Sequence, residues 1–269
     1  MPPETQVKHR SRVRVASAAV AVVATACLVG ALARGSQPPG PTKVVLGAFA
    51  TDLSDRTPHQ RYNARRAAAS VDGKVVQPGK VFSFNQAVKG WTADRGFLRA
   101  PVSYDGVLVD DYGGGVCQAS TTLYNAALIA GLPILERHPH TFSPGYAPVG
   151  RDAAVAYSGV DLRFRNPYPW PITIRALPED HRLVCRVEGP VAPATRAVIS
   201  ERILDRFPAP QASIEPGSGF KRTRWRATGR DGVRVTVYRD FFRAGNPAGT
   251  ELISDNTYLP IARTEWGSG

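Results

Sequence analysis

The chain has 269 residues, 43% of them hydrophobic and 21% charged, which excludes a disordered chain and a small scaffold that needs disulfides or metals to fold. Its formal net charge of +12 indicates attraction to polyanions, which include nucleic acid, anionic lipid and acidic cell-wall polymers. The charge alone does not choose among these partners.

The N-terminus predicts a membrane segment. Residues 1–14 carry a basic cluster, and the uncharged run 15–33 has 19 residues, close to the roughly 20 that span a bilayer. Because basic flanks stay inside, we expect a cytoplasmic tail, one span and a domain outside the cell membrane. Secretion after cleavage at Ala31-Leu32-Ala33 and a lipoprotein acylated at Cys27 are the alternatives. Export in each case argues against nucleic acid as a partner.

The remainder predicts an α+β fold, with early helices packed on a mainly antiparallel sheet. A Pro/Gly-rich linker covers 34–43, and the folded domain covers 44–190. A β-rich C-terminal extension, 191–269, is expected to pack on that domain.

Two helices stand out in the domain. The first is expected over 58–71, with Thr57 as its cap and Pro58 in its first turn. The second, over 118–130, is the clearest element, and Gly131-Leu132-Pro133 ends it. Extended chain is expected at 75–84, 101–104, 107–109, 153–157, 161–165, 172–176, 183–187 and 251–258, together with a hairpin of 224–228 and 233–241.

Cys117 is the most informative residue, because a glycine-rich turn delivers it onto the first turn of the second helix. Backbone N–H groups and the positive end of the helix dipole favour a thiolate there. The missing side chains of Gly113, Gly114 and Gly115 are expected to let a substrate backbone approach. The sequence therefore predicts a nucleophilic cysteine.

A disulfide between Cys117 and Cys185 is the competing interpretation for an exported domain, and it would remove the nucleophile. Cys185 lies in a short strand-like run without glycines, so the two environments look unalike.

A thiolate nucleophile needs a base and a group that orients the base. His140 follows the helix closely enough to return to the Cys117 end, and His138 is the alternative. Asp152 is the candidate acceptor for an imidazole N–H, with Asp161 as the fallback.

A zinc site is a rival use of the same residue types, but neither C-x-x-C nor H-E-x-x-H spacing occurs. No Gly-Lys-Ser/Thr follows the glycines, so a phosphate-binding loop is not indicated either. We expect no metal and no cofactor. The side chains that a zinc site would draw on are Cys117, His138, His140, His181 and Cys185.

Several motifs occur together in the region of roughly 55–190, and the Gly-Gly-Gly-x-Cys-Gln stretch is the most specific of them. The motifs are Pro78 to Asn85, Gly113 to Gln118 with Ser120 to Ala127, Glu136 to His140, Gly150 to Ala153, and Asp161 to Asn166. Together they resemble the VanW family, whose name comes from glycopeptide (vancomycin) resistance gene clusters.

The resemblance implies an extracytoplasmic protein of the cell wall, because some members are cysteine-dependent L,D-transpeptidases that cross-link peptidoglycan. It places the nucleophile on Cys117 and the histidine on His140, with Thr141 in place of the family's serine. Peptidoglycan stem peptides are then the expected partners, and the oligomeric state stays open. Backbone N–H groups near Gly115, supported by Gln118, are expected to hold the oxyanion, with Ser120 and Thr121 lining the site.

Two other functions remain open. A non-catalytic wall-binding module would use the same glycine-rich segment to hold a stem peptide or glycan. A cysteine peptidase or carboxypeptidase of the wall would cleave stems without cross-linking them. The basic run 221–226 is interpreted as a solvated sheet face, with contact to anionic wall polymer as the alternative.

Overall fold

The computed structural model describes residues 43–104, 107–157, 159–214 and 229–266. The chain divides into two units, 1–42 and 43–269, and only the second contains described residues. In the described part of the chain, no helix is long and apolar enough to cross a membrane. The segment 15–33, on which the membrane prediction rests, lies outside the described residues, as do the tail 1–14 and nearly all of the linker.

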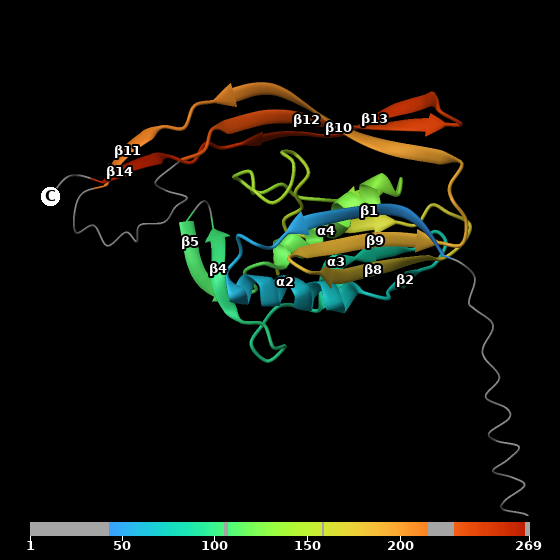
Figure 1. Ribbon diagram of the computed structural model, residues 1–269, viewed down its shortest axis with the longest axis horizontal. Coiled ribbons are helices and arrows are strands. Elements are labelled where there is room, and N and C mark those ends of the chain that lie inside the picture. The colour runs from blue at the N-terminus through green and yellow to red at the C-terminus, as the bar shows by residue number, and fades with distance from the viewer. Residues whose placement is uncertain (1–42, 105–106, 158, 215–228, 267–269) are drawn as a thin grey trace, which may run out of the picture. The chain divides into compact units, whose positions relative to one another are not determined.

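The first sheet is antiparallel and has the strand order β1-β9-β8-β2. Figure 1 shows its long strands β1, β9 and β8 side by side. A shift of register at Gly47 makes β1 bulge. The strands are β1 (Val44–Asp52), β2 (Val75–Val76), β8 (Ile172–Glu179) and β9 (Arg182–Gly189).

Two helices, α2 (Pro58–Val71) and α4 (Val116–Ile129), pack on this sheet and on each other. Helix α2 has the predicted bounds and the predicted cap, Thr57, which forms a reciprocal capping box with Gln60; Asp72 is its C-cap residue. Helix α4 is buried along almost its whole length and contacts β1 and β9. The expected early helices on an antiparallel sheet are thus found.

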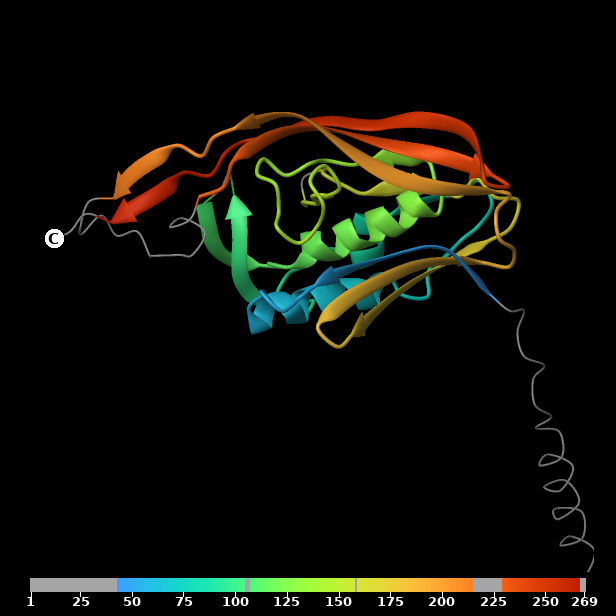
Figure 2. The ribbon, with the colours of Figure 1, turned by 45° about the horizontal axis from the view of Figure 1, so that its top comes forward.

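A second long sheet, formed by the C-terminal extension, has the antiparallel strand order β10-β12-β13. In Figure 2, α4 lies between this sheet and the first one, and α4 contacts both β1 and β10. Ile199 and Ile253 of the extension pack against the main hydrophobic core. The strands are β10 (Thr195–Phe207), β12 (Gly232–Arg243) and β13 (Asn246–Tyr258).

Smaller elements complete the architecture. The short helix α3 spans Phe84–Val88, where Phe84 was expected to be extended. The strands form an antiparallel sheet β3-β7-β6, the hairpin β4-β5 and the parallel pair β11-β14. Their bounds are β3 (Val81–Ser83), β4 (Arg99–Tyr104), β5 (Val107–Tyr112), β6 (Ile134–Glu136), β7 (Arg163–Arg165), β11 (Gln211–Ile214) and β14 (Arg263–Trp266).

The expected α+β class is confirmed at the level of mostly antiparallel sheets with few helices. The predicted strand 153–157 is wrong, because this segment makes only isolated bridges from Ala154 and Ala156. The strand β12 pairs with β10 and β13, whereas 224–228, its expected hairpin partner, lies outside the described residues together with the basic run 221–226.

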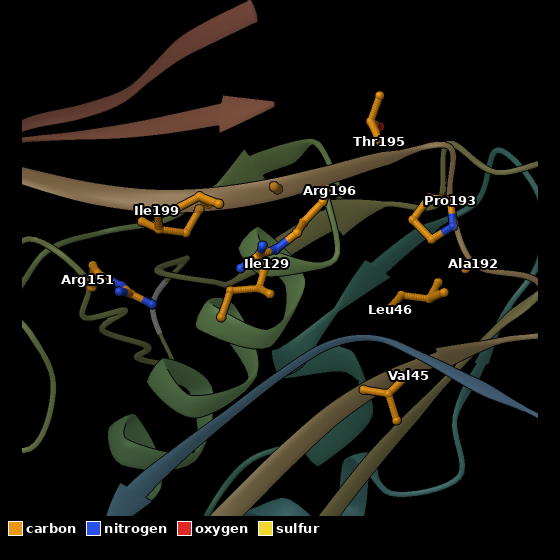
Figure 3. Close-up of a pocket in the computed structure, with 11 residues that line it drawn as sticks. Val45, Leu46, Ile129, Arg151, Ala192, Pro193, Thr195, Arg196 and Ile199 are labelled. Carbon is orange, nitrogen blue, oxygen red and sulfur yellow. The ribbon is translucent and has the colours of Figure 1, made fainter. Parts of the chain in front are cut away.

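A cavity of about 510 Å³ separates β10 from β1 beside the end of α4. Figure 3 shows Val45 and Leu46 of β1 on one side of it, Ile199 of β10 on the other, and Ile129 of α4 between them.

A substitution at Gly47 tests how closely β1 packs on α4. A Cβ atom there would lie 2.3 Å from Ala130 N and 2.4 Å from Ala126 O, and both are backbone atoms that cannot swing aside. We expect Gly47→Ala to lower the free energy of unfolding by about 3 kcal/mol, measured by urea denaturation. The control is Gly79→Ala, where nothing lies within 4 Å and only the positive φ of 71° is strained, at about 1 kcal/mol. Equal losses in the two variants would contradict the packing.

Candidate active site

Cys117 lies on the first turn of α4, as predicted, and its side chain is half-buried. Gly115 is the N-cap residue and has a φ of 109°, in the left-handed region that favours glycine. A Cβ atom on Gly115 would also lie 2.2 Å from Gln60 O of α2. The backbone conformation of Gly115 and the close approach of Gln60 O therefore both require glycine at this position. The turn that it completes places Cys117 on the first turn of α4.

The three glycines serve the protein's own packing and do not leave open space for a substrate. A Cβ atom on Gly113 would lie 2.2 Å from Cδ1 of Trp91, and one on Gly114 would lie 2.6 Å from Pro101 O. The expectation that these missing side chains admit a substrate backbone is therefore corrected. What the glycines build is the tight turn before Cys117.

His140 and Asp152 form a close hydrogen-bonded pair. Nδ1 of His140 lies 2.5 Å from Oδ2 of Asp152, and the backbone N–H of His140 donates to the same oxygen at 2.7 Å. Asp152 is 1% exposed and His140 is 22% exposed at the side chain, so the pair is buried at the carboxylate and reaches solvent at the imidazole. The two residues that the sequence predicts as base and orienting group are thus neighbours in the structure.

The thiol of Cys117 donates to Val155 O at 3.5 Å, and its pKa also responds to the imidazole of His140. Burial raises the pKa of Cys117, but a side-chain hydrogen bond with His140 and the charge of His140 outweigh burial and lower it. Burial lowers the pKa of His140, whereas its hydrogen bonds with Asp152 and Cys117 raise that pKa to about 10. Both shifts favour a thiolate beside an imidazolium, the reactive form of a catalytic cysteine.

Asp152 stays ionised in spite of its burial. Its Oδ1 accepts from Nη2 of Arg137 at 2.9 Å and from the hydroxyl of Tyr258 at 2.5 Å. Burial raises the pKa of Asp152, but the hydrogen bond and charge of His140, the charge of Arg137 and the hydrogen bond of Tyr258 lower it. A buried carboxylate with this many donors is charged and fixed in orientation.

Polar residues on α4 hold the segment that carries Asp152. Ser120 Oγ donates to Ala153 O at 2.5 Å, and the N–H of Ala153 donates to Thr121 Oγ1 at 2.9 Å. Asn125 Nδ2 donates to Arg151 O at 2.8 Å. Ser120 and Thr121, predicted to line the substrate site, are fully buried, and their hydroxyls fix the position of Ala153, next to Asp152.

Gln118 also differs from its predicted role at the oxyanion. Its side chain is buried, and its Nε2 donates to Asp52 O at 2.7 Å and to Thr51 Oγ1 at 3.1 Å, which anchors α4 to β1. The backbone N–H groups of Val116 and Gln118 donate to the carbonyls of Gly113 and Gly115. These two N–H groups are therefore engaged within the turn.

The two alternate site residues lie in other environments. His138 pairs with Glu136 through Nε2 at 3.1 Å, and its side chain is 44% exposed. Asp161 accepts hydrogen bonds from Ser83 Oγ and from the backbone of Asn85, so it supports the start of α3. The structure thus brings His140 and Asp152 to Cys117 and leaves His138 and Asp161 elsewhere.

Cys185 is fully buried in β9, and both Cys117 and Cys185 are free thiols, so the disulfide interpretation is wrong. Burial raises the pKa of the Cys185 thiol, in contrast to that of Cys117. Among the described residues, no group of three or more His, Cys, Asp or Glu side chains is arranged to hold a metal ion.

Tyr146 is a site residue that the sequence analysis missed. Its side chain makes a hydrogen bond with Thr121, and Arg56 lies 5.3 Å from the centroid of its ring. Burial, followed by the charges of Cys117 and Asp152, raises the pKa of Tyr146, so its phenol stays protonated. The only sequence signal is its position in the Pro/Gly-rich loop after His140.

Cys117, His140 and Asp152 lie in a region of the chain that is similar to a known protein family. The model of the VanW like protein family matches residues 59–188. The YoaR protein of Bacillus subtilis (strain 168) is 44% identical over 131 residues, which are 49% of this chain and 43% of that protein. The vancomycin B-type resistance protein VanW of Enterococcus faecalis (strain ATCC 700802 / V583) is 28% identical over 131 residues, 47% of this chain and 48% of that protein. No solved structure matches.

The pKa of Cys117 is directly testable by alkylation with iodoacetamide. We expect the alkylation rate of the wild type to reach half its maximum below pH ~8.5, the ordinary thiol value, because His140 lowers the pKa of the thiol. His140→Gln should move the midpoint above ~8.5, since burial then acts without the imidazole.

The matched control is His138→Gln, which removes a histidine that is paired with Glu136 and should leave the midpoint unchanged. A wild-type midpoint at the ordinary value, or equal shifts in the two histidine variants, would contradict the assignment of His140.

Proposed function

The chain belongs to the VanW-like family through residues 59–188, and from this premise we propose that it is a cysteine acyltransferase of the cell wall, with peptidoglycan stem peptides as its substrates. The reaction that we assign is L,D-transpeptidation through a thioester on Cys117. The chain spans about half the length of the curated relatives it matches. One of them is named for vancomycin resistance, which directs the proposal to the cell wall.

The observation that carries the proposal is the coupled set of Cys117, His140 and Asp152. A thiol in an ordinary buried position, such as that of Cys185, has a raised pKa, whereas Cys117 has a lowered one. The imidazole that lowers it is held by a carboxylate with its own supporting donors. Nucleophile, base and orienting group in this relation are the constellation of acyl transfer.

In the first half of the reaction, the Cys117 thiolate attacks the carbonyl carbon of the third stem residue. The C–N bond to the terminal D-alanine breaks, and the imidazolium of His140 gives its proton to the leaving amine. The products are a thioester on Cys117, neutral His140 and free D-alanine. Asp152 stays ionised and holds the Nδ1–H side of the ring, so that Nε2 handles the proton.

In the second half, the side-chain amine of a diamino acid on a neighbouring stem attacks the thioester. His140 takes a proton from that amine, the C–S bond breaks, and the thiolate and imidazolium form again. Water in place of the amine gives carboxypeptidase activity by the same steps. The acceptor therefore decides between cross-linking and trimming.

Two donors are suited to the oxyanion. The N–H groups of Val116 and Gln118 are engaged in the turn, so the N–H of Cys117 itself is the better backbone candidate. The protonated phenol of Tyr146, whose pKa responds to the charge of Cys117, is the second. A donor that meets the developing charge contributes to catalysis in the transition state and not in the ground state.

The proposal includes the location of the reaction. Peptidoglycan lies outside the cell membrane, and the uncharged run 15–33 after a basic tail is the segment that would carry the domain there. We propose a single-pass anchor, with secretion after cleavage as the other arrangement.

Replacing Cys117 tests the proposal. We expect purified wild-type protein, incubated with tetrapeptide muropeptides, to release D-alanine and to form cross-linked dimers that mass spectrometry detects. Cys117→Ala should lower the rate of both by about a thousandfold or more, because the remaining site has no nucleophile.

Cys185→Ala is the matched control, since it removes the other cysteine of the described residues from a buried strand and should keep the activity. If the products are monomeric muropeptides that have lost D-alanine, without cross-linked dimers, the protein is a hydrolase and not a transpeptidase. Retention of peptidoglycan binding with no product in the wild type would assign the binding module and overturn the enzyme.

A further inference from the structure

The C-terminal sheet lies outside the family match at 59–188, yet β10 and β13 each send a polar group to Asp152 or to the residue before it, and β12 holds the far end of α4. Glu201 of β10 accepts from Nη1 of Arg151 at 3.0 Å. Arg239 of β12, which is almost fully buried, donates to Leu132 O at 2.8 Å, just after the end of α4. The third contact, from Tyr258 of β13, reaches the catalytic aspartate itself.

Tyr258 is fully buried, in a small core cluster with Val233 and Val235. Its hydroxyl donates to Oδ1 of Asp152 at 2.5 Å and accepts from Nη2 of Arg137 at 3.2 Å. Burial, together with the charge of Asp152, raises the pKa of Tyr258, so the hydroxyl keeps its proton and remains a donor.

The two oxygens of Asp152 face different partners. Oδ2 accepts both hydrogen bonds from His140, and Oδ1 accepts those from Arg137 and Tyr258. Rotation of the carboxyl group would break the contacts on both oxygens at once. The donors at Oδ1 therefore fix the plane of the carboxylate in which Oδ2 meets the imidazole.

The same sheet also supports the loops on either side of this pair. The N–H of Leu259 donates to Thr141 O at 2.9 Å, directly after His140. A Cβ atom on Gly150 would lie 2.6 Å from Cγ2 of Val237, so the turn before Asp152 packs tightly on β12. The register of β12 and β13 thus sets the position of both catalytic loops.

We propose that Tyr258 is a positioning residue of the Cys117–His140–Asp152 site, and that the C-terminal sheet is for this reason part of the catalytic machinery. The inference rests on the proposed function and deepens it. The region matched by the family model does not contain every hydrogen-bond donor to Asp152. Tyr258 of β13, about a hundred residues further along the chain, supplies one of them.

The test is Tyr258→Phe in the full chain, which keeps the ring and removes the hydroxyl. A hydrogen bond to a charged acceptor is lost, so we expect kcat for D-alanine release to fall about tenfold to hundredfold, with KM within about twofold. The alkylation midpoint of Cys117 should also move to higher pH, because His140 is then less firmly held against the thiol.

The matched control is Tyr168→Phe, which removes a hydroxyl that donates to Ala130 O at 2.7 Å, at the far end of α4 from Cys117. This variant should keep kcat, KM and the midpoint. A folded Tyr258→Phe with wild-type kcat and midpoint overturns the inference, and equal losses in both variants overturn it as well, because they indicate only general loosening.

If Tyr258→Phe does not unfold cooperatively, and so is not properly folded, a second variant of β13 provides the test. Asn256→Leu keeps the tyrosine but removes the acceptor for Nη1 of Arg137, which lies 3.0 Å away, and should lower kcat in the same direction. An unchanged kcat in that variant overturns the inference.

Failure of the proposed function has a different signature. If the wild type has an ordinary alkylation midpoint and forms no product, both the proposed function and the inference are overturned. If the wild type is active and the Tyr258→Phe and Asn256→Leu variants have the same kcat, only the inference is overturned.

Discussion

The buried carboxylate of Asp152 is the constraint on which the site depends. A charge that is 1% exposed is strongly unfavourable unless donors surround it, and here the backbone and ring of His140, Arg137 and Tyr258 supply hydrogen bonds. Arg137 and His140 come from the segment after α4 and Tyr258 comes from β13, so the carboxylate ties that segment to the C-terminal sheet. The orientation of the imidazole, and through it the state of the thiol, follows from this arrangement.

Helix α4 serves this carboxylate as much as it serves the cysteine. Its first turn presents Cys117, and one turn later Ser120 and Thr121 hold Ala153 next to Asp152. Cys117 and Asp152 are thus fixed to the same rigid element. The helix lies between two sheets, so its position is set from both sides. Preorganisation of this kind is what acyl transfer requires, since misplaced groups lose rate steeply.

Local patterns predicted the parts of the site that depend on neighbours in the chain. The glycine turn before a periodic helix places Cys117 correctly, and the short connection after the helix brings His140 back. The packing role of the glycines is not predictable from local sequence, because their neighbours Trp91, Pro101 and Gln60 come from other segments. The strand expected at 153–157 fails for a related reason, since side chains of α4 bind the backbone N–H and C=O of Ala153. Tyr258 was out of reach, because nothing local links β13 to Asp152.

The most direct test of this account is the intact mass of the protein after incubation with a stem tetrapeptide. The account predicts an added mass equal to the donor minus D-alanine, mapped by peptide fragmentation to Cys117 and absent from Cys117→Ala. A protein whose Cys117 is readily alkylated, yet which forms no such adduct or carries it on another residue, would contradict the central claim.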